Sequence, residues 1–311
     1  MSFKISNLKL QAMWSGNDIA NRFKQLQAFI VAQLENIDGV SFSSDEWERS
    51  QGGGGITKTI VNGNVIEKGG VAFSKVEGEV TPLMKSQMGM QGNVFLATGV
   101  SIVLHSKHPL HPIIHMNVRY FETDNNESWF GGGIDLTPIY IEPKKARRFH
   151  EGLSEICGDY QSDAYDKFKA WADDYFFLSH RNETRGVGGI FFDHVKPENE
   201  GHKDALMNFC LALGEAFPKL YAQQLVENPA LPTTNELEWQ AIRRSRYVEF
   251  NLLFDKGTKF GIVSNGRTES IFLSMPPVAK WVYNFQTETD TREHHTLQLL
   301  TKGIDWLNYN A

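Results

Sequence analysis

Three candidate strands follow one another through the middle of the chain and are separated only by short connections. They cover residues 93–105, 114–122 and 133–141, which are rich in β-branched and aromatic residues and are bounded by turn-forming residues. A short connection can join antiparallel neighbours, whereas parallel strands need a long crossover. The sequence therefore predicts an antiparallel sheet at the centre of the fold.

Further strands are expected on either side of this group. Asn62-Gly63 lies between two β-rich segments and tolerates the positive φ angles of a tight hairpin. Lys256-Gly257 is expected to join two more antiparallel strands by another tight connection. The additional strands are expected at residues 56–61, 65–66, 189–192, 247–254 and 260–263.

Helical periodicity is found before and between these strands. Residues 18–36 carry one apolar stripe at helical spacing. Because the strands cluster instead of alternating strictly with helices, we expect an α+β fold in which α-helices flank a large antiparallel β-sheet on both faces. Without a repeat or an interdomain linker, residues 1–311 are expected to form a single domain. The other helices are expected near residues 144–156, 163–178, 203–224 and 236–245 and after His294.

The composition of the chain limits the classes of protein to which it can belong. The 311-residue chain has a formal net charge of -6, so it offers no global attraction for nucleic acid or for an anionic membrane. No segment approaches the roughly 20 apolar residues of a membrane helix, so we expect no membrane insertion and a cytoplasmic location. Cys157 and Cys210 lack CxxC spacing and are expected to be small core residues.

Four histidines are candidates for proton transfer or for metal binding. They lie on separate predicted elements, so a shared site requires that the fold bring them together. For each of them, a hydrogen-bonded structural role is an equally open interpretation. These residues are His105, His115, His150 and His180.

The predicted strand that contains His115 gives stronger evidence for a site than the four histidines do by themselves. Side chains alternate along a strand, so His115, Asn117 and Arg119 share one face. If that face lines a cavity, it offers a proton donor, an amide and a cation that can bind a carboxylate through two hydrogen bonds. The alternative is an exposed face of a half-solvated sheet.

Glycine-rich segments mark two further places. Asp135 follows three consecutive glycines, which let a ligand or another backbone approach closely, and its partly desolvated carboxylate favours a substrate with N–H donors. The alternative is a turn cap with Thr137. Residues 185–193, R-G-V-G-G-I-F-F-D, lack the glycine order of a dinucleotide loop, so we reject nucleotide binding.

Arg267 follows a flexible turn and either binds a second carboxylate or is a plain turn residue.

Seven motifs, in this order, resemble those of the oxygen-dependent coproporphyrinogen III oxidases, over roughly residues 47–311. The resemblance implies oxidative decarboxylation of two propionates of coproporphyrinogen III to vinyl groups, giving protoporphyrinogen IX in haem biosynthesis while O2 is reduced to H2O2. It also implies a homodimer in which residues 247–281 form the interface. The motifs are W-E-R-S-Q-G-G-G-G, E-K-G-G-V-A-F-S, H-M-N-V-R-Y-F, W-F-G-G-G-I-D-L-T-P, Y-F-F-L-S-H-R-N-E-T-R-G-V-G-G-I-F-F-D, R-Y-V-E-F-N-L-L-F-D-K-G-T-K-F-G and G-R-T-E-S-I-F-L-S-M-P-P.

The resemblance also implies roles for individual residues. His115 corresponds to a proton donor, Arg119 to a substrate carboxylate clamp, and Asp135 to a carboxylate that faces the pyrrole N–H groups. Some bacterial members are assigned a divalent metal, at positions that correspond here to His105, His115, His150 and His180. The implied substrate-binding residues are Ser101, Asn117, Val118, Arg119, Asn265, Gly266 and Arg267.

The chain departs from the family pattern at four positions. Ser128 replaces the first of two tryptophans, Ala72 stands where Asn is common, and Ser245 and Asn265 each replace a glycine. None of these changes removes an implied catalytic group. Asn tolerates positive φ better than most residues, so the turn before Arg267 can still form.

The chemistry expected from these residues requires no cofactor. We hypothesise that Asp135 polarises a pyrrole N–H, which makes the ring electron-rich enough to react with O2 as co-substrate, while His115 manages a proton. Two alternatives remain open at this point. One is a metal-dependent oxygenase that uses the histidines, and the other is a non-catalytic tetrapyrrole-binding protein.

Overall fold

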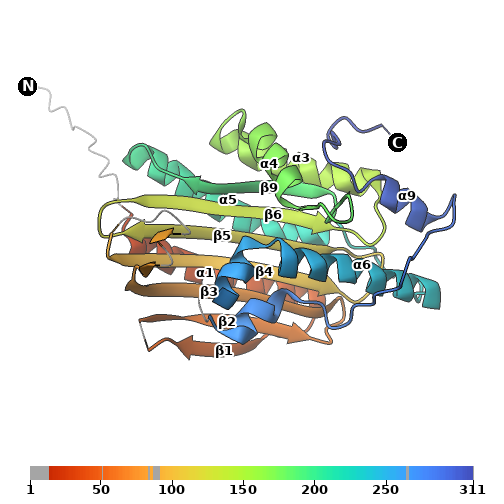
Figure 1. Ribbon diagram of the computed structural model, residues 1–311, viewed down its shortest axis with the longest axis horizontal. Coiled ribbons are helices and arrows are strands. Elements are labelled where there is room, and N and C mark those ends of the chain that lie inside the picture. The colour runs from red at the N-terminus through yellow and green to blue at the C-terminus, as the bar shows by residue number, and fades with distance from the viewer. Residues whose placement is uncertain (1–13, 51, 83–84, 87–91, 264–265, 311) are drawn as a thin grey trace, which may run out of the picture.

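A seven-stranded antiparallel sheet forms the middle layer of the protein (Figure 1), which a computed structural model describes for residues 14–50, 52–82, 85–86, 92–263 and 266–310. The strand order is β1-β2-β3-β4-β5-β6-β9, so each strand pairs with the next strand of the sheet along the chain. Two helices and two short strands lie between β6 and β9 in the sequence. The strands are β1 Ser43–Glu48, β2 Gly53–Val61, β3 Ile66–Glu79, β4 Val94–Ser106, β5 Ile113–Thr123, β6 Ser128–Thr137 and β9 Gly188–Val195.

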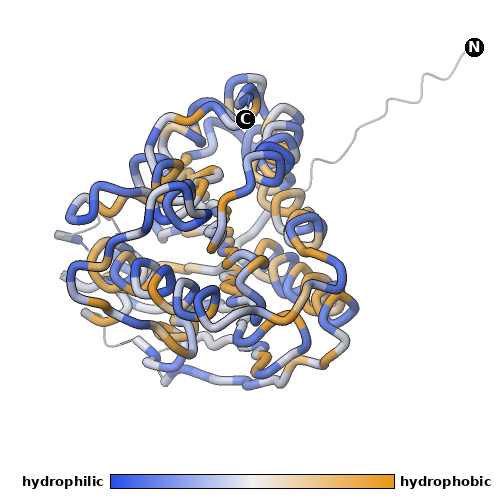
Figure 2. Tube along the Cα trace, turned by 90° about the vertical axis from the view of Figure 1, so that its right-hand side faces the viewer, coloured by the Kyte–Doolittle hydropathy of each residue, from blue (hydrophilic) through white to orange (hydrophobic). Residues whose placement is uncertain are grey.

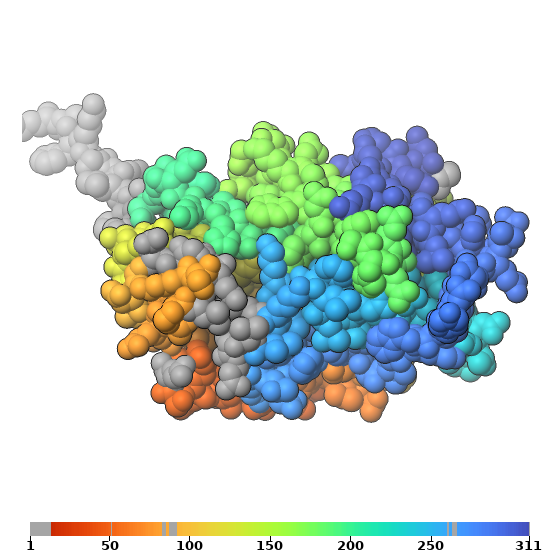
Figure 3. Space-filling view, in the orientation of Figure 1, coloured from red at the N-terminus to blue at the C-terminus, as the bar shows by residue number. Residues whose placement is uncertain are grey.

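Helices cover both faces of this sheet, which confirms the predicted α+β class (Figure 1). α1 (Gly16–Asp38) and α5 (Glu200–Ala222) pack together on one face. α6 (Thr234–Leu253) and α7 (Lys256–Val263) lie on the other, in front of the sheet in Figure 3. The remaining elements are α3 Pro143–Tyr160, α4 Ala164–Tyr175, α8 Thr268–Ile271, η1 Phe272–Ser274, α9 Arg292–Gln298 and the short strands β7 Phe177–Leu178 and β8 Glu183–Thr184.

The main hydrophobic core lies between the sheet and the α1 and α5 layer. The apolar stripe predicted for residues 18–36 is buried there, and Val100, Ile102, Met116 and Val118 of β4 and β5 point into the same core. Figure 2 shows hydrophobic residues gathered where helices meet the sheet. Within the described residues, no helix is both long enough and apolar enough to cross a bilayer.

The strands predicted at residues 247–254 and 260–263 are wrong, because both segments are helical. α6 begins with a capping box in which Thr233 and Glu236 satisfy each other's backbone N–H groups, and it continues through Leu253. Tyr247 and Phe250 are buried at helical spacing, so tertiary burial overrides the β propensity of the local sequence. Lys256-Gly257 consequently begins α7 and forms no hairpin.

The hairpin predicted at Asn62-Gly63 is confirmed, with Asn62 at a φ of 59°. Asp38 at the end of α1 links this hairpin to the helix layer. Its buried carboxylate accepts hydrogen bonds from the backbone N–H groups of Asn64, Val65 and Ile66 at 2.7–2.9 Å. One side chain therefore fixes the hairpin against the helix that covers the sheet.

Asp38→Ala is expected to lower the free energy of unfolding by about 2–4 kcal/mol, because it leaves buried backbone donors without an acceptor. Urea denaturation measures this loss. Asp159→Ala, at an exposed position of α3, is the control and should change stability by no more than about 0.5 kcal/mol. A similar small effect at Asp38 would contradict the proposed link.

Candidate active site

A row of polar residues crosses the sheet face opposite the main core. His115, Asn117 and Arg119 share this face of β5, as their period-two spacing predicts. Asp135 on β6 is the register partner of His115, and Gly131 is the partner of Arg119. The even-numbered neighbours on β5 are buried on the other side.

Small residues surround this row on the neighbouring strands. Ser101 on β4 is exposed although it lies on the central strand of the sheet, and Gly99 beside it is only partly buried. Ala72 and Ser74 are their register partners on β3 and are also partly buried. The part of this face around Ser101 is therefore open to solvent, and its small side chains leave room for a broad ligand.

His115, Asp135 and Arg185 form the chemically strongest group on this face. His115 Nδ1 lies 2.8 Å from Asp135 Oδ1, while Arg185 donates from Nε to Oδ2 at 2.9 Å and from Nη2 to Oδ1 at 2.5 Å. Burial by itself would raise the pKa of Asp135, but the Arg185 guanidinium and the His115 hydrogen bond outweigh it and hold the pKa below its usual value. Asp135 is thus an ionised, oriented acceptor beside His115 on the neighbouring strand.

Sequence reasoning assigned no role to Arg185. The guanidinium is 2% exposed and lies 4.4–4.7 Å from the ring centroids of Phe176, Tyr247 and Phe250. A buried carboxylate needs a cationic or hydrogen-bonding partner, so Asp135 implied that a partner existed. Only the fold identifies it, because Arg185 lies 50 residues further along the chain.

Arg119 is held at the other end of the row. It donates from Nη1 to Asn117 Oδ1 at 2.9 Å and forms an ion pair from Nη2 to Asp193 Oδ1 at 2.9 Å. Its side chain remains 41% exposed, so its guanidinium can still meet a ligand carboxylate. A Cβ at Gly131 would lie 2.8 Å from both Arg119 Nε and Asp193 Oδ1, so glycine leaves the space that this pair occupies.

The remaining residues implied by the resemblance are distributed around this face. The Val118 side chain is fully buried in the main core, so it cannot contact a ligand on the polar face. Arg267 pairs with Asp45 and lies over the Trp47 ring, both on edge strand β1. Gly266 donates its N–H to Gly261 O at 2.8 Å. Asn265 lies outside the described residues.

Arg119 and Arg267 therefore mark two sides of the open face. Four strand spacings separate β5 from β1, which corresponds to roughly 19 Å at about 4.8 Å per spacing. Between the two cations lies the floor of small residues. This arrangement suits a broad, flat molecule that carries several carboxylates.

The four candidate metal-ligating histidines do not meet at one point. His105 bonds from Nε2 to Ser274 O at 2.8 Å, and His150 uses both ring nitrogens on Tyr165 Oη and Val187 O at 2.9 Å. His180 bonds to Glu249, and His115 bonds to Asp135. Across the described residues, no group of three or more His, Cys, Asp or Glu side chains is arranged to hold a metal ion. The side chains therefore do not fit the metal that the resemblance implies.

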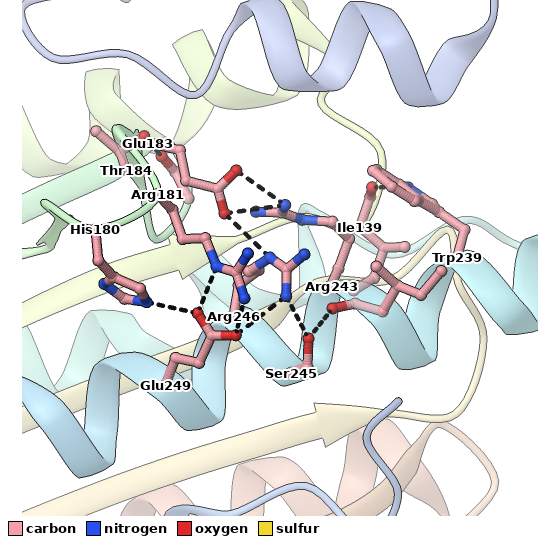
Figure 4. A network of polar contacts seen from close by, with 12 residues as sticks. Ile139, His180, Arg181, Glu183, Thr184, Trp239, Arg243, Ser245, Arg246 and Glu249 are labelled. Carbon is pink, nitrogen blue, oxygen red and sulfur yellow. Dashed lines mark hydrogen bonds and ion pairs between the residues drawn. The ribbon is translucent and has the colours of Figure 1, made fainter. Parts of the chain in front are cut away.

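His180 belongs instead to a network that fastens the α4–β9 connection to α6 (Figure 4). Glu249 accepts from His180 at 2.7 Å, from Arg181 at 2.7 and 2.8 Å, and from Arg246 at 3.1 Å. Burial opposes ionisation of Glu249, yet these donors lower its pKa to about 2. Arg243 of α6 pairs with Glu183 in the same connection, at 3.1 Å.

Comparison with known proteins relates this arrangement to one family. A family model described as coproporphyrinogen III oxidase matches residues 18–306. A curated oxygen-dependent coproporphyrinogen-III oxidase of Prochlorococcus marinus strain MIT 9312 is 41% identical over 315 residues, which cover 93% of this chain and 92% of that protein. The protein of the same name from strain MIT 9301 is 40% identical with the same coverage.

Gly131→Ala is expected to destabilise the protein by about 1–3 kcal/mol, because the added methyl group overpacks the Arg119–Asp193 pair. Gly158→Ala is the matched control, since a Cβ at this α3 position meets nothing within 4 Å. The control should be neutral or slightly stabilising, because alanine favours a helix. Thermal or urea unfolding compares the two variants, and equal stabilities would show that Gly131 has free space.

Stability is also expected to fall as the pH drops from about 6.5 towards 4. Burial lowers the pKa of His150 to about 4 and that of His105 to about 3, whereas both titrate near 6.5 when unfolded. The unfolded chain then binds more protons, so the stabilisation is complete above pH 6.5 and is lost below it. His150→Gln should make this pH dependence shallower in urea denaturation, and an unchanged dependence would contradict the expectation.

Proposed function

The chain belongs to the coproporphyrinogen III oxidase family, and from this premise we propose that it converts two propionates of coproporphyrinogen III to vinyl groups with O2 as the oxidant. The product is protoporphyrinogen IX, an intermediate of haem biosynthesis. The observation that carries the proposal is the open sheet face, on which His115 and Arg119 border a floor of small residues. A tetrapyrrole is broad and carries its carboxylates at its rim, so its shape and charge match this face.

Each decarboxylation balances without an added reductant. The propionate R–CH2–CH2–COOH and O2 become R–CH=CH2, CO2 and H2O2. The β-carbon loses hydrogen, the carboxyl group leaves as CO2, and the two electrons pass to O2. The protein must therefore bind the carboxylates and supply or accept a proton while O2 is reduced to peroxide.

We assign the proton step to His115. Its side chain is 16% exposed, whereas that of Asp135 is 2% exposed and is already engaged by Arg185 and His115. Contact between Asp135 and a pyrrole N–H requires this group to rearrange, so Asp135 is better suited to orient His115. Arg119 supplies the carboxylate clamp because it is cationic and partly exposed.

We propose that the reaction requires no metal or organic cofactor. This rests on the partners of the histidines, since both ring nitrogens of His150 and Nε2 of His105 are bonded within the protein. A metal-dependent oxygenase remains a competing function and predicts that chelation abolishes activity and that stoichiometric metal restores it. A tetrapyrrole carrier predicts binding without release of CO2 or H2O2.

We also propose a homodimer that uses residues 247–281 and a cytoplasmic location. Large exposed hydrophobic side chains are concentrated in and beside this segment, as expected for a contact surface. The two cysteines are buried free thiols, which is compatible with a reducing compartment. The exposed side chains are Leu252, Leu253, Ile262, Phe272, Val278, Trp281 and Tyr283.

His115→Gln is expected to lower kcat by about 100-fold or more, because it removes the group that manages the proton. An assay on metal-analysed protein, with and without O2 and chelator, should follow the vinyl product by fluorescence after oxidation. His202→Gln is the control, since His202 bonds to Tyr160 outside the site. Near-normal turnover of His115→Gln would refute its assignment, and turnover without O2 would refute the reaction.

Leu253→Asp combined with Ile262→Asp is expected to convert the dimer to a monomer, because two charges would be buried in the proposed interface. Sedimentation velocity at micromolar protein concentration measures the change. Leu231→Asp introduces a charge at a side chain that is 93% exposed and outside the segment, so it should leave the dimer intact. A dimer that survives the double substitution would place the interface elsewhere.

A further inference from the structure

We propose that Arg185 and Asp193, which lie at the two ends of the segment 185–193, are positioning residues. They position the two groups that act on the substrate, the His115 imidazole and the Arg119 guanidinium. Arg185 holds Asp135 so that it orients His115, and Asp193 holds Arg119 in place as the carboxylate clamp. The inference rests on the proposed function, because it assumes that His115 transfers a proton and that Arg119 binds a substrate carboxylate. Neither residue needs to contact the substrate.

The Arg185 contact has the geometry of a fixed support. Two nitrogens of one guanidinium bond to the two oxygens of Asp135, which leaves the carboxylate a single orientation. Oδ1 of that carboxylate then bonds to His115 Nδ1 at 2.8 Å, so the ring presents its other nitrogen, Nε2, towards Asn117 at 3.4 Å. The imidazole orientation is therefore set through Asp135.

Aromatic rings restrain Arg185 from the other side. Phe176, Tyr247 and Phe250 enclose the guanidinium, and Tyr247 and Phe250 belong to α6. The network around Glu249 fastens the preceding residues, His180 and Arg181, to the same helix (Figure 4). A lysine at position 185 retains the charge but cannot bond to both carboxylate oxygens with a planar fork.

The Asp193 contact is the counterpart at the other end of the segment. Asp193 is 14% exposed and pairs with Arg119, while the Asn117 amide bonds to another nitrogen of the same guanidinium. Burial raises the pKa of Asp193, but Arg119 outweighs this effect and keeps the pKa below its ordinary value. The carboxylate consequently stays ionised and holds the guanidinium over the sheet.

The backbone between the two residues brings both of them into reach. A Cβ at Gly189 would lie 1.9 Å from Ile134 O, and one at Gly186 would lie 2.1 Å from Leu136 O. Glycine at these two positions allows the segment to approach β6 closely. Phe191 then stacks on Tyr175 with a centroid distance of 4.0 Å, which fixes the segment between Arg185 and Asp193.

Steady-state kinetics with coproporphyrinogen III separate the two roles. Arg185→Lys should lower kcat by about 10- to 100-fold and change KM by less than about 3-fold, because the orientation of His115 is lost while binding is retained. Asp193→Asn should raise KM by about 10-fold and change kcat much less, because Arg119 loses its fixed position. The Kd for coproporphyrin III, measured by fluorescence, should rise only in Asp193→Asn.

A double substitution tests whether Arg185 acts through Asp135. If it does, Arg185→Lys combined with Asp135→Asn should lower kcat no further than Asp135→Asn alone, because both changes disable one unit. If the losses in kcat caused by the two single substitutions multiply in the double variant, the inference is wrong. This comparison uses isosteric or charge-conserving replacements, and circular dichroism and urea unfolding verify that each variant is folded.

Two matched controls distinguish positioning from general loss of structure. Arg244→Lys alters another buried arginine, which lies on α6 and pairs with Glu67, and Asp173→Asn alters a 13%-exposed carboxylate, which pairs with Lys169. Both should change stability without separating KM from kcat. The inference fails if the controls reproduce the effects of the test variants. If the wild type binds coproporphyrin III but forms no H2O2 from coproporphyrinogen III and O2, the proposed reaction fails, while the Kd contrast still tests Asp193.

Discussion

The alternation of side chains across the central strands is the constraint on which the other features depend. Along β5, Met116 and Val118 enter the core beneath α1 and α5, while His115, Asn117 and Arg119 face the opposite side. A shift in register by one residue would exchange these faces and place an arginine in the core. The long antiparallel ladders on both sides of β5 make such a shift unfavourable. Folding of the apolar face thus places the polar groups.

Charge balance on the polar face comes from a distant segment. Asp135 and Arg185 are each 2% exposed, and removal of either partner would leave an uncompensated buried charge. Such a pair adds little stability by itself, because desolvation offsets the attraction between the charges. Its value lies in orientation, since groups held in place before the reaction need not reorganise during it. The Arg119–Asp193 pair applies the same principle at a more exposed position.

The segment 247–254 shows why local composition can mislead. Its aromatic and branched residues favour a strand, yet Tyr247 encloses Arg185 and Phe250 packs against Phe176 only when both project from a helix. The capping box at Thr233 gives the helix a defined start, and burial of these rings carries it past the predicted end near residue 245. The helix also gives Glu249 its place in the network of Figure 4.

The sequence by itself determined the antiparallel sheet, its helical layers and the face shared by His115, Asn117 and Arg119, because strand periodicity and turn chemistry are local properties. It also indicated that residues 105–140 carry the site, and its motifs indicated the family. Only the tertiary structure decided which partners complete the site. Arg185 meets Asp135 and Asp193 meets Arg119 across 50 and 74 residues of chain. The tertiary structure also decided that the four candidate histidines lie apart, because contacts between distant residues depend on how the whole sheet and its helices pack.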